Sequence, residues 1–295
     1  MLYPSNNVNK IINRIIWVTQ KNIEVVENRA LKKEELKERT KRNKFFLMKS
    51  ISKIRAVAIW IFILPFFAVN ICLILSQSFE FKEFDVAEPG SYFLGLKIMS
   101  LGDAIADSAS DWIIPYFDGV ASISRVVRVF PNYLIFKPAM FITAFFLIRY
   151  WIFNKNLIEE IIGNHKNLKK IYYLGIASAI CLIIHSIFLG IKFDIAIYKL
   201  LRRVVLLLFI FFEIAAQFYL IKILIEIKPK INTLINSKIL YLKRILVYLL
   251  IFITIFSLPF LPFDNFKILK HMLEWNFFLG VIFFYFLTFL MWKKK

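Results

Sequence analysis

Six long apolar runs, separated by short polar or charged stretches, cover most of the chain after residue 55. The first run has 20 residues without a charge, enough to cross about 30 Å of hydrocarbon at 1.5 Å per residue. This pattern predicts an all-α, polytopic integral membrane protein with six transmembrane helices. The predicted spans are Ala56–Leu75, Tyr133–Phe153, Ile171–Leu189, Val204–Ile225, Ile245–Leu261 and Trp275–Trp292.

Residues 1–55 form a separate, strongly basic segment ahead of the first span. Apolar side chains recur there at helical spacing, at Ile12, Ile15, Ile16, Ile23 and Val26. We therefore expect two parts: an amphipathic arm at 1–55 that lies against the membrane, and a six-helix domain at 56–295. A protein partner bound through the arm is the alternative.

Composition supports lipid as the main solvent, because 59% of the residues are hydrophobic and 17% are aromatic. The net charge of +19 comes from short clusters between apolar runs. That arrangement favours anionic membrane phospholipids as partners and argues against nucleic acid. Two cysteines inside apolar runs and three scattered histidines predict no disulfide, no metal site and no cofactor.

The basic residues also predict which way the chain crosses the membrane. With the N-terminus inside, 26 Lys and Arg residues fall in inner segments and 10 in outer loops. Both termini are therefore expected in the cytoplasm. Four basic residues in the loop between the third and fourth spans run against this count, and a re-entrant segment there would reverse the later spans.

The longest loop, 76–132, holds eight acidic and four basic residues and is expected outside as a helical or re-entrant segment. Its acidic cluster comprises Asp103, Asp107 and Asp111, which recur every four residues, and Asp118. On a helix the first three would share one stripe, which suits a divalent cation or a lipid headgroup. The alternative is an acidic face in contact with water.

Ser122, Ser124, Arg125 and Arg128 follow within seven residues. Arg125 and Arg128 would share a helical face at the membrane boundary, where their guanidinium groups suit a phosphate. The alternative is that they neutralise the aspartates or lie among headgroups without selectivity.

Polar side chains also occur deep in the predicted spans. His185 lies in the third, and Glu213 and Gln217 lie one turn apart in the fourth. Buried ionisable groups in a membrane often mark a proton or ion pathway, and an interhelical hydrogen bond is the alternative.

Part of the loop resembles the superfamily of damage-regulated autophagy modulators, Sfk-type membrane proteins and GPI-anchor remodelling proteins. The resemblance is carried by Pro115-Tyr116-Phe117-Asp118-Gly119, by Ser122-Ile123-Ser124 and by the segment from Pro131 to Lys137. It implies a first helix, a sizeable non-cytoplasmic loop and five more helices, with a role in lipid handling.

We therefore expect a multi-pass membrane protein that binds or organises lipids through the external Asp/Ser/Arg segment, without catalysis. One alternative is a lipid-modifying enzyme with Asp107, Asp111 or Asp118 as base and Ser122 or Ser124 as the reacting hydroxyl. The other is a transporter or channel that uses Glu213 and His185.

Overall fold

The computed structural model describes residues 6–78, 92–93, 96–97, 113–163, 165–189, 196–257, 259 and 266–293. It divides into two compact units, Met1–Ser50 and Ile51–Lys295. Helix α1 (Asn6–Ser78) runs without a break through the predicted boundary at residue 55 and supplies both the arm and the first span. The division into an arm at 1–55 and a membrane domain at 56–295 stays a prediction.

Six described helices are long and apolar enough to cross a membrane, which confirms the predicted all-α, multi-pass fold. The first span is the Phe45–Ser78 part of α1. The others are α5 (Asn132–Ile162), α6 (Lys166–Phe188), α7 (Ala196–Glu226, span from Leu200), α9 (Ser237–Ser257) and α10 (Lys267–Met291). The protein is therefore an integral membrane protein.

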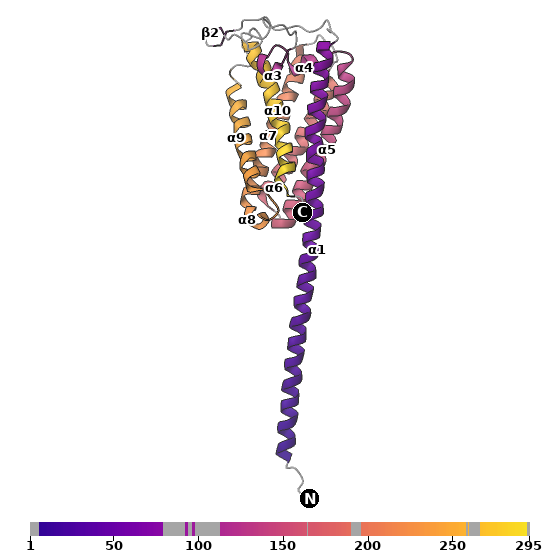
Figure 1. The fold of residues 1–295 in the computed structure, drawn as a ribbon, viewed down its shortest axis with the longest axis vertical. Coiled ribbons are helices and arrows are strands. Elements are labelled where there is room, and N and C mark those ends of the chain that lie inside the picture. The colour runs from indigo at the N-terminus through magenta and orange to yellow at the C-terminus, as the bar shows by residue number, and fades with distance from the viewer. Residues whose placement is uncertain are drawn as a thin grey trace. The chain divides into compact units, whose positions relative to one another are not determined.

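Five short elements complete the described secondary structure. They are the paired strands β1 (Tyr92–Phe93) and β2 (Leu96–Lys97) and the helices α3 (Pro115–Asp118), α4 (Ile123–Val126) and α8 (Lys228–Ile231). Figure 1 shows α3 and α4 at the end of the bundle where α10 begins, and α8 at the opposite end. We call these the cap end and the far end.

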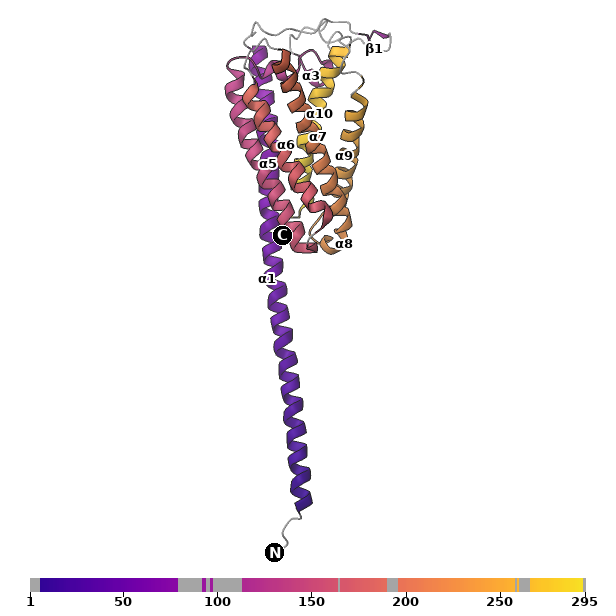
Figure 2. The same ribbon diagram turned by 180° about the vertical axis from the view of Figure 1, so that it is seen from behind.

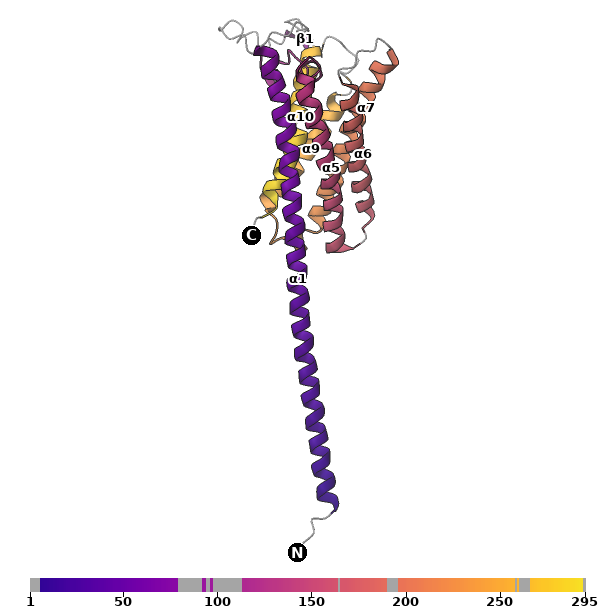
Figure 3. The same cartoon turned by 90° about the vertical axis from the view of Figure 1, so that its right-hand side faces the viewer.

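The spanning helices pack in a chain of neighbours, with α6 in contact with both α5 and α7, and α9 in contact with both α7 and α10. Figures 2 and 3 show α6 beside α7 and beside α5, respectively. Gly175 permits the close approach of α6 to α5, because a Cβ there would collide with the indole of Trp151. Small residues at helix contacts are typical of membrane bundles.

Three helices begin about two turns before the apolar pattern predicts: α7 at Ala196, α9 at Ser237 and α10 at Lys267. Those extra turns carry Lys243, Lys270 and Glu274, whose charges lower the local hydropathy. The prediction missed them because hydropathy scores each charge as if it faced lipid, whereas these side chains point into the protein.

Hydrogen bonds from α10 hold the cap segment 113–131 in place. The indole Nε1 of Trp275 donates to Ala121 O at 2.7 Å, and Asn276 Nδ2 donates to Tyr116 O at 2.7 Å. His271 Nδ1 lies 3.0 Å from the carbonyl oxygen of Gly119. Gly119 ends α3 at a φ of 61°, and a Cβ there would collide with the carbonyl of Ile268.

A second set of hydrogen bonds ties the cap segment to α1. The side-chain amide of Asn132 donates to Cys72 O at 2.8 Å, Ser76 Oγ at 2.6 Å and Val126 O at 2.7 Å. Tyr116 donates to Asn70 Oδ1 at 3.2 Å, and burial raises the pKa of this hydroxyl more than the hydrogen bond to Asn70 lowers it. The cap segment is therefore fixed between the first and last spans.

Candidate functional site

A partly open cavity of about 340 Å³ lies between α1, α4, α5, α6, α7, α9 and α10. Its walls are mostly aliphatic and aromatic, for example Ile61, Phe136, Met140, Leu182 and Phe278. The volume falls within the range of about 300–1,000 Å³ that small-molecule sites occupy. The apolar walls suit a hydrocarbon chain.

The cap end of this cavity is polar. Its lining there includes Ser124 on α4, His185 in the last turn of α6, Ser257 at the end of α9, and Lys270 and Glu274 in the first two turns of α10. An amphipathic molecule would therefore find polar partners at this end and an apolar channel below them.

Glu274 connects α10 to the predicted Ser/Arg segment. Its carboxyl group hydrogen-bonds the backbone of Ser124 and lies within electrostatic range of Arg125. His271, one turn earlier on α10, also interacts electrostatically with Arg125. The cap end thus brings acidic and basic groups to one rim.

The deepest polar group in the cavity is the Glu213 cluster, which consists of Glu213, Ser178, Gln217 and Tyr285. Ser178 Oγ lies 2.7 Å from Glu213 Oε2, and Gln217 Nε2 donates to Glu213 Oε1 at 3.0 Å. The hydroxyl of Tyr285 donates to the same Oε1 atom. Both Glu213 and Tyr285 line the cavity, and all four side chains are buried.

A fully buried lysine lies behind this cluster. Lys243 Nζ donates to Thr288 Oγ1 at 2.6 Å and sits 3.8 Å from the ring centroid of Phe284. Thr288 Oγ1 is also 3.2 Å from the hydroxyl of Tyr150, whose ring packs edge-on against Tyr285. Aromatic and hydroxyl groups therefore separate the buried lysine from the buried glutamate.

His185 and Glu213 line the same cavity but have separate partners. His185 hydrogen-bonds the backbone of Arg202, and its Nδ1 atom is buried without a hydrogen-bond partner in the described part of the chain. The structure thus brings the two predicted intramembrane groups to one cavity and pairs Glu213 with Gln217.

The four residues of the predicted Ser/Arg segment have different positions relative to this cavity. Ser122 caps α4 by accepting from Arg125 N at 3.3 Å, and its hydroxyl lies 3.3 Å from that of Ser124. Helix α4 ends at Val126, so Arg125 and Arg128 do not share the continuous helical face that their spacing predicts. Arg128 Nε is buried without a hydrogen-bond partner among the described residues.

Asp118 differs from its prediction as part of a water-facing acidic cluster. It is 5% exposed, and its carboxylate accepts from Ile114 N at 2.6 Å and Val120 N at 2.9 Å. This side chain therefore ties the residue before α3 to the turn that follows it. Asp103, Asp107 and Asp111 lie outside the described residues.

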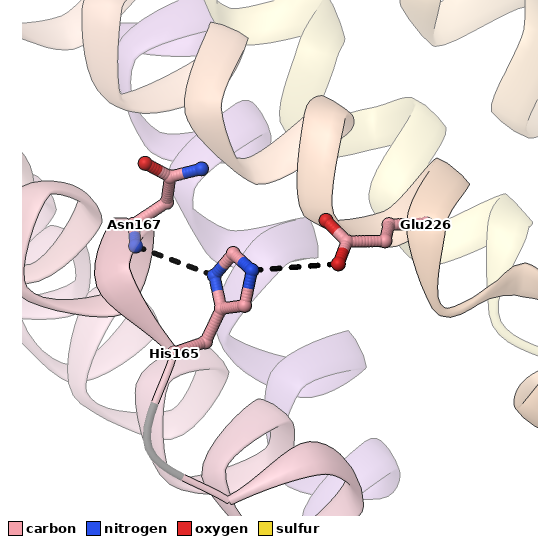
Figure 4. A network of polar contacts seen from close by, with 3 residues as sticks. All are labelled: His165, Asn167 and Glu226. Atoms are coloured by element: carbon pink, nitrogen blue, oxygen red, sulfur yellow. Dashed lines mark hydrogen bonds and ion pairs between the residues drawn. The ribbon is translucent and has the colours of Figure 1, made fainter.

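A separate polar contact lies at the far end. His165 Nε2 is 3.4 Å from Glu226 Oε1, and His165 Nδ1 accepts from Asn167 N at 3.3 Å (Figure 4). The contact joins the start of α6 to the end of α7. Glu226 is 56% exposed, so this contact lies at the surface, outside the cavity, and it is an ion pair when His165 is protonated.

Sequence reasoning missed several residues of the site: Ser178, Lys243, Lys270, Glu274 and Tyr285. Lys270 and Glu274 carried a readable signal, because they lie one turn apart immediately before an apolar run. Ser178 and Tyr285 carried none, since small hydroxyl and aromatic residues are common in any span.

No family model matches the chain, and no curated protein or solved structure does so either. The resemblance to the autophagy-modulator superfamily stays a prediction. The protein is a multi-pass integral membrane protein with a largely apolar, partly open cavity that is polar at its cap end.

Proposed function

We propose that this protein binds an amphipathic lipid, with the hydrocarbon chain in the cavity and the headgroup at the cap end. The observation that carries the proposal is the cavity itself: apolar walls lead to a rim of Ser124, Lys270 and Glu274. A hydrocarbon chain gains about 0.8 kcal/mol per CH₂ removed from water, and the rim supplies hydrogen bonds to a head.

Charge at the rim favours a headgroup that contains phosphate. Lys270 lines the cavity, and Arg125 lies next to Ser124, so two cations lie at this rim together with the Glu274 carboxyl group. Glu274 adds an acceptor for a hydroxyl or an ammonium group. This proposal replaces the aspartates of the predicted external segment with residues of α10 and keeps Ser124 and Arg125.

The proposal includes an orientation, with the cap end outside and the termini in the cytoplasm. The excess of Lys and Arg in the predicted inner segments supports it. Under this orientation the headgroup comes from the outer leaflet.

Binding without catalysis is preferred over a lipid-modifying enzyme because of Asp118. Of the three candidate bases, Asp118 is the one in the described part of the chain, and two backbone N–H groups occupy its carboxylate. A base must be free to take a proton from the reacting hydroxyl.

Native mass spectrometry of the purified protein tests the binding proposal. Leu206→Trp places an indole in the cavity wall, whereas Leu208→Trp places the same group on the exposed face of the same helix. We expect a co-purifying phospholipid on the wild type and on Leu208→Trp. Loss of about two buried methylene groups costs about 1.6 kcal/mol, so lipid occupancy should fall roughly tenfold in Leu206→Trp.

The headgroup has its own pair of variants. Lys270→Met removes a cation that lines the cavity, and Lys267→Met removes one in the preceding turn that does not line it. Phospholipid affinity should fall by about tenfold or more in the first variant alone. Equal lipid retention in Leu206→Trp and Leu208→Trp would contradict the use of the cavity.

A further inference from the structure

The Glu213 cluster supplies more hydrogen-bond partners than a purely structural contact needs. Glu213 is fully buried, and its carboxyl group meets Ser178, Gln217 and Tyr285 from three helices. Since an isolated buried charge in a membrane is costly, ionisable groups at such depth usually serve a function. Glu213 also lines the cavity, although its side chain has no solvent-accessible surface.

The hydroxyl group of Ser178 can form hydrogen bonds with Glu213 in both of its protonation states. The single hydroxyl hydrogen of Ser178 has two acceptors in range, Gly175 O at 2.9 Å and Glu213 Oε2 at 2.7 Å. When Glu213 is a carboxylate, Ser178 donates to Oε2. When Glu213 carries a proton on Oε2, it donates to Ser178 Oγ, and Ser178 donates to Gly175 O. No heavy atom has to move between the two states.

The titratable groups around Glu213 come from three of the helices packed on it. They are Tyr150 on α5, Tyr285 on α10 and Lys243 on α9, the last reached through Thr288. From α6 and from α7 itself the neighbours are the neutral Ser178 and Gln217. A charge on Lys243 would favour the carboxylate, because Coulomb attraction is strong in a dry interior.

Cavity occupancy changes the solvent available to Glu213. An empty cavity can admit water, which stabilises a carboxylate. A hydrocarbon chain excludes that water and favours the neutral acid. The hydroxyl partners accommodate both forms, so the cluster need not unfold or repack.

We propose that Glu213 is a proton-binding site whose occupancy is coupled to the cavity: uptake of an apolar chain goes with uptake of one proton by Glu213. The proton adds to Oε2 from solvent and leaves to solvent when the chain departs, so no other reactant is needed. The coupling rests on the proposed lipid binding, whereas the proton site itself does not.

Infrared difference spectroscopy of the full chain in dodecyl maltoside tests the proposal, because this detergent has no carbonyl group. The added probe is hexadecylphosphocholine, which has an apolar chain and a phosphate but no carbonyl group. We expect a protonated-carboxyl C=O band that is absent in Glu213→Gln and grows several-fold at fixed pH when the probe is added. Native mass spectrometry on the same samples reports whether the probe is bound.

Two further variants keep the result interpretable if Glu213→Gln misfolds. Ser178→Ala should keep the band but shift its frequency, because Oε2–H loses its acceptor. Lys243→Met should enlarge the band at fixed pH, whereas Lys222→Met, an exposed lysine on the same helix as Glu213, should not.

The outcomes separate the two claims. A missing Glu213-dependent band at every pH at which the protein stays folded overturns the proton site. A band that is equal with and without bound probe overturns the coupling and leaves lipid binding intact. If the probe does not bind, the coupling fails together with the proposed function, and the pH titration of the band still decides the proton site.

Discussion

The bundle contains two buried polar clusters, one around Asn132 and one around Glu213. Both central side chains are fully buried, but they have different hydrogen-bond partners. Asn132 donates to the backbone carbonyls of Cys72 and Val126 and to Ser76, and none of these residues lines the cavity. Glu213 has hydroxyl and amide side chains as partners and lines the cavity. Backbone carbonyls can only accept hydrogen bonds, whereas hydroxyl groups can reverse them.

This difference separates the structural role of Asn132 from the role that we propose for Glu213. The Asn132 contacts demand one geometry and hold the cap segment against α1. The Glu213 contacts tolerate a change of charge at the edge of a cavity. Burial of a polar side chain is thus a weak guide to function unless the nature of its partners is considered.

The largest stability effect is expected at Asn132. Asn132→Leu keeps the size but removes all three amide contacts and leaves buried acceptors without a donor. The free energy of unfolding should fall by about 2–4 kcal/mol. Unfolding in mixed dodecyl maltoside and SDS, followed by tryptophan fluorescence, measures it. Lipid occupancy of the folded fraction should stay unchanged. If Asn132→Leu unfolds with the same free energy as the wild type, Asn132 has no structural role.

Trp275→Phe tests the opposite side of the cap segment. The change removes the indole N–H that donates to Ala121 O and leaves a small void. Unfolding free energy should fall by about 1–2 kcal/mol in the same assay. Asn276→Ala is a useful control, because its side chain also bonds the cap segment but is exposed, so its effect should be smaller.

Glu213→Gln should have little effect on stability. The amide retains the size of the carboxyl group, and the hydroxyl groups of Ser178 and Tyr285 can turn to meet its oxygen or its nitrogen. We expect a change below about 1 kcal/mol. A loss as large as that in Asn132→Leu would show that Glu213 holds the bundle together and would erase the contrast between the two clusters.

The smallest effect is expected outside both clusters, at the far-end ion pair. Glu226→Gln removes the contact with His165 in a partly exposed position. When the histidine is protonated, such pairs contribute about 0.2–1 kcal/mol, and salt screens them. The difference from wild type should therefore shrink as NaCl is raised in the unfolding assay, and a salt-independent loss would point to a packing role instead.

Many residues of the candidate site could not be predicted from hydropathy, because their positions depend on tertiary contacts. Glu213 and Gln217 were predictable because a carboxylate and an amide one turn apart in an apolar run are conspicuous. Lys270 and Glu274 were excluded from the predicted span because their charges lower the average. Asp118 was predicted to face water, since its two backbone partners depend on the turn that Gly119 makes with α10 close by.

The sequence by itself determined the membrane class and the six spans, because apolar length and charge act locally along the chain. Only the tertiary structure decided that α1, α4, α5, α6, α7, α9 and α10 enclose a cavity, that Glu274 reaches Ser124, and that Lys243 lies buried near Thr288. Those contacts join residues far apart in sequence. Their existence depends on how the helices pack, and no local pattern of apolar and polar residues specifies that packing.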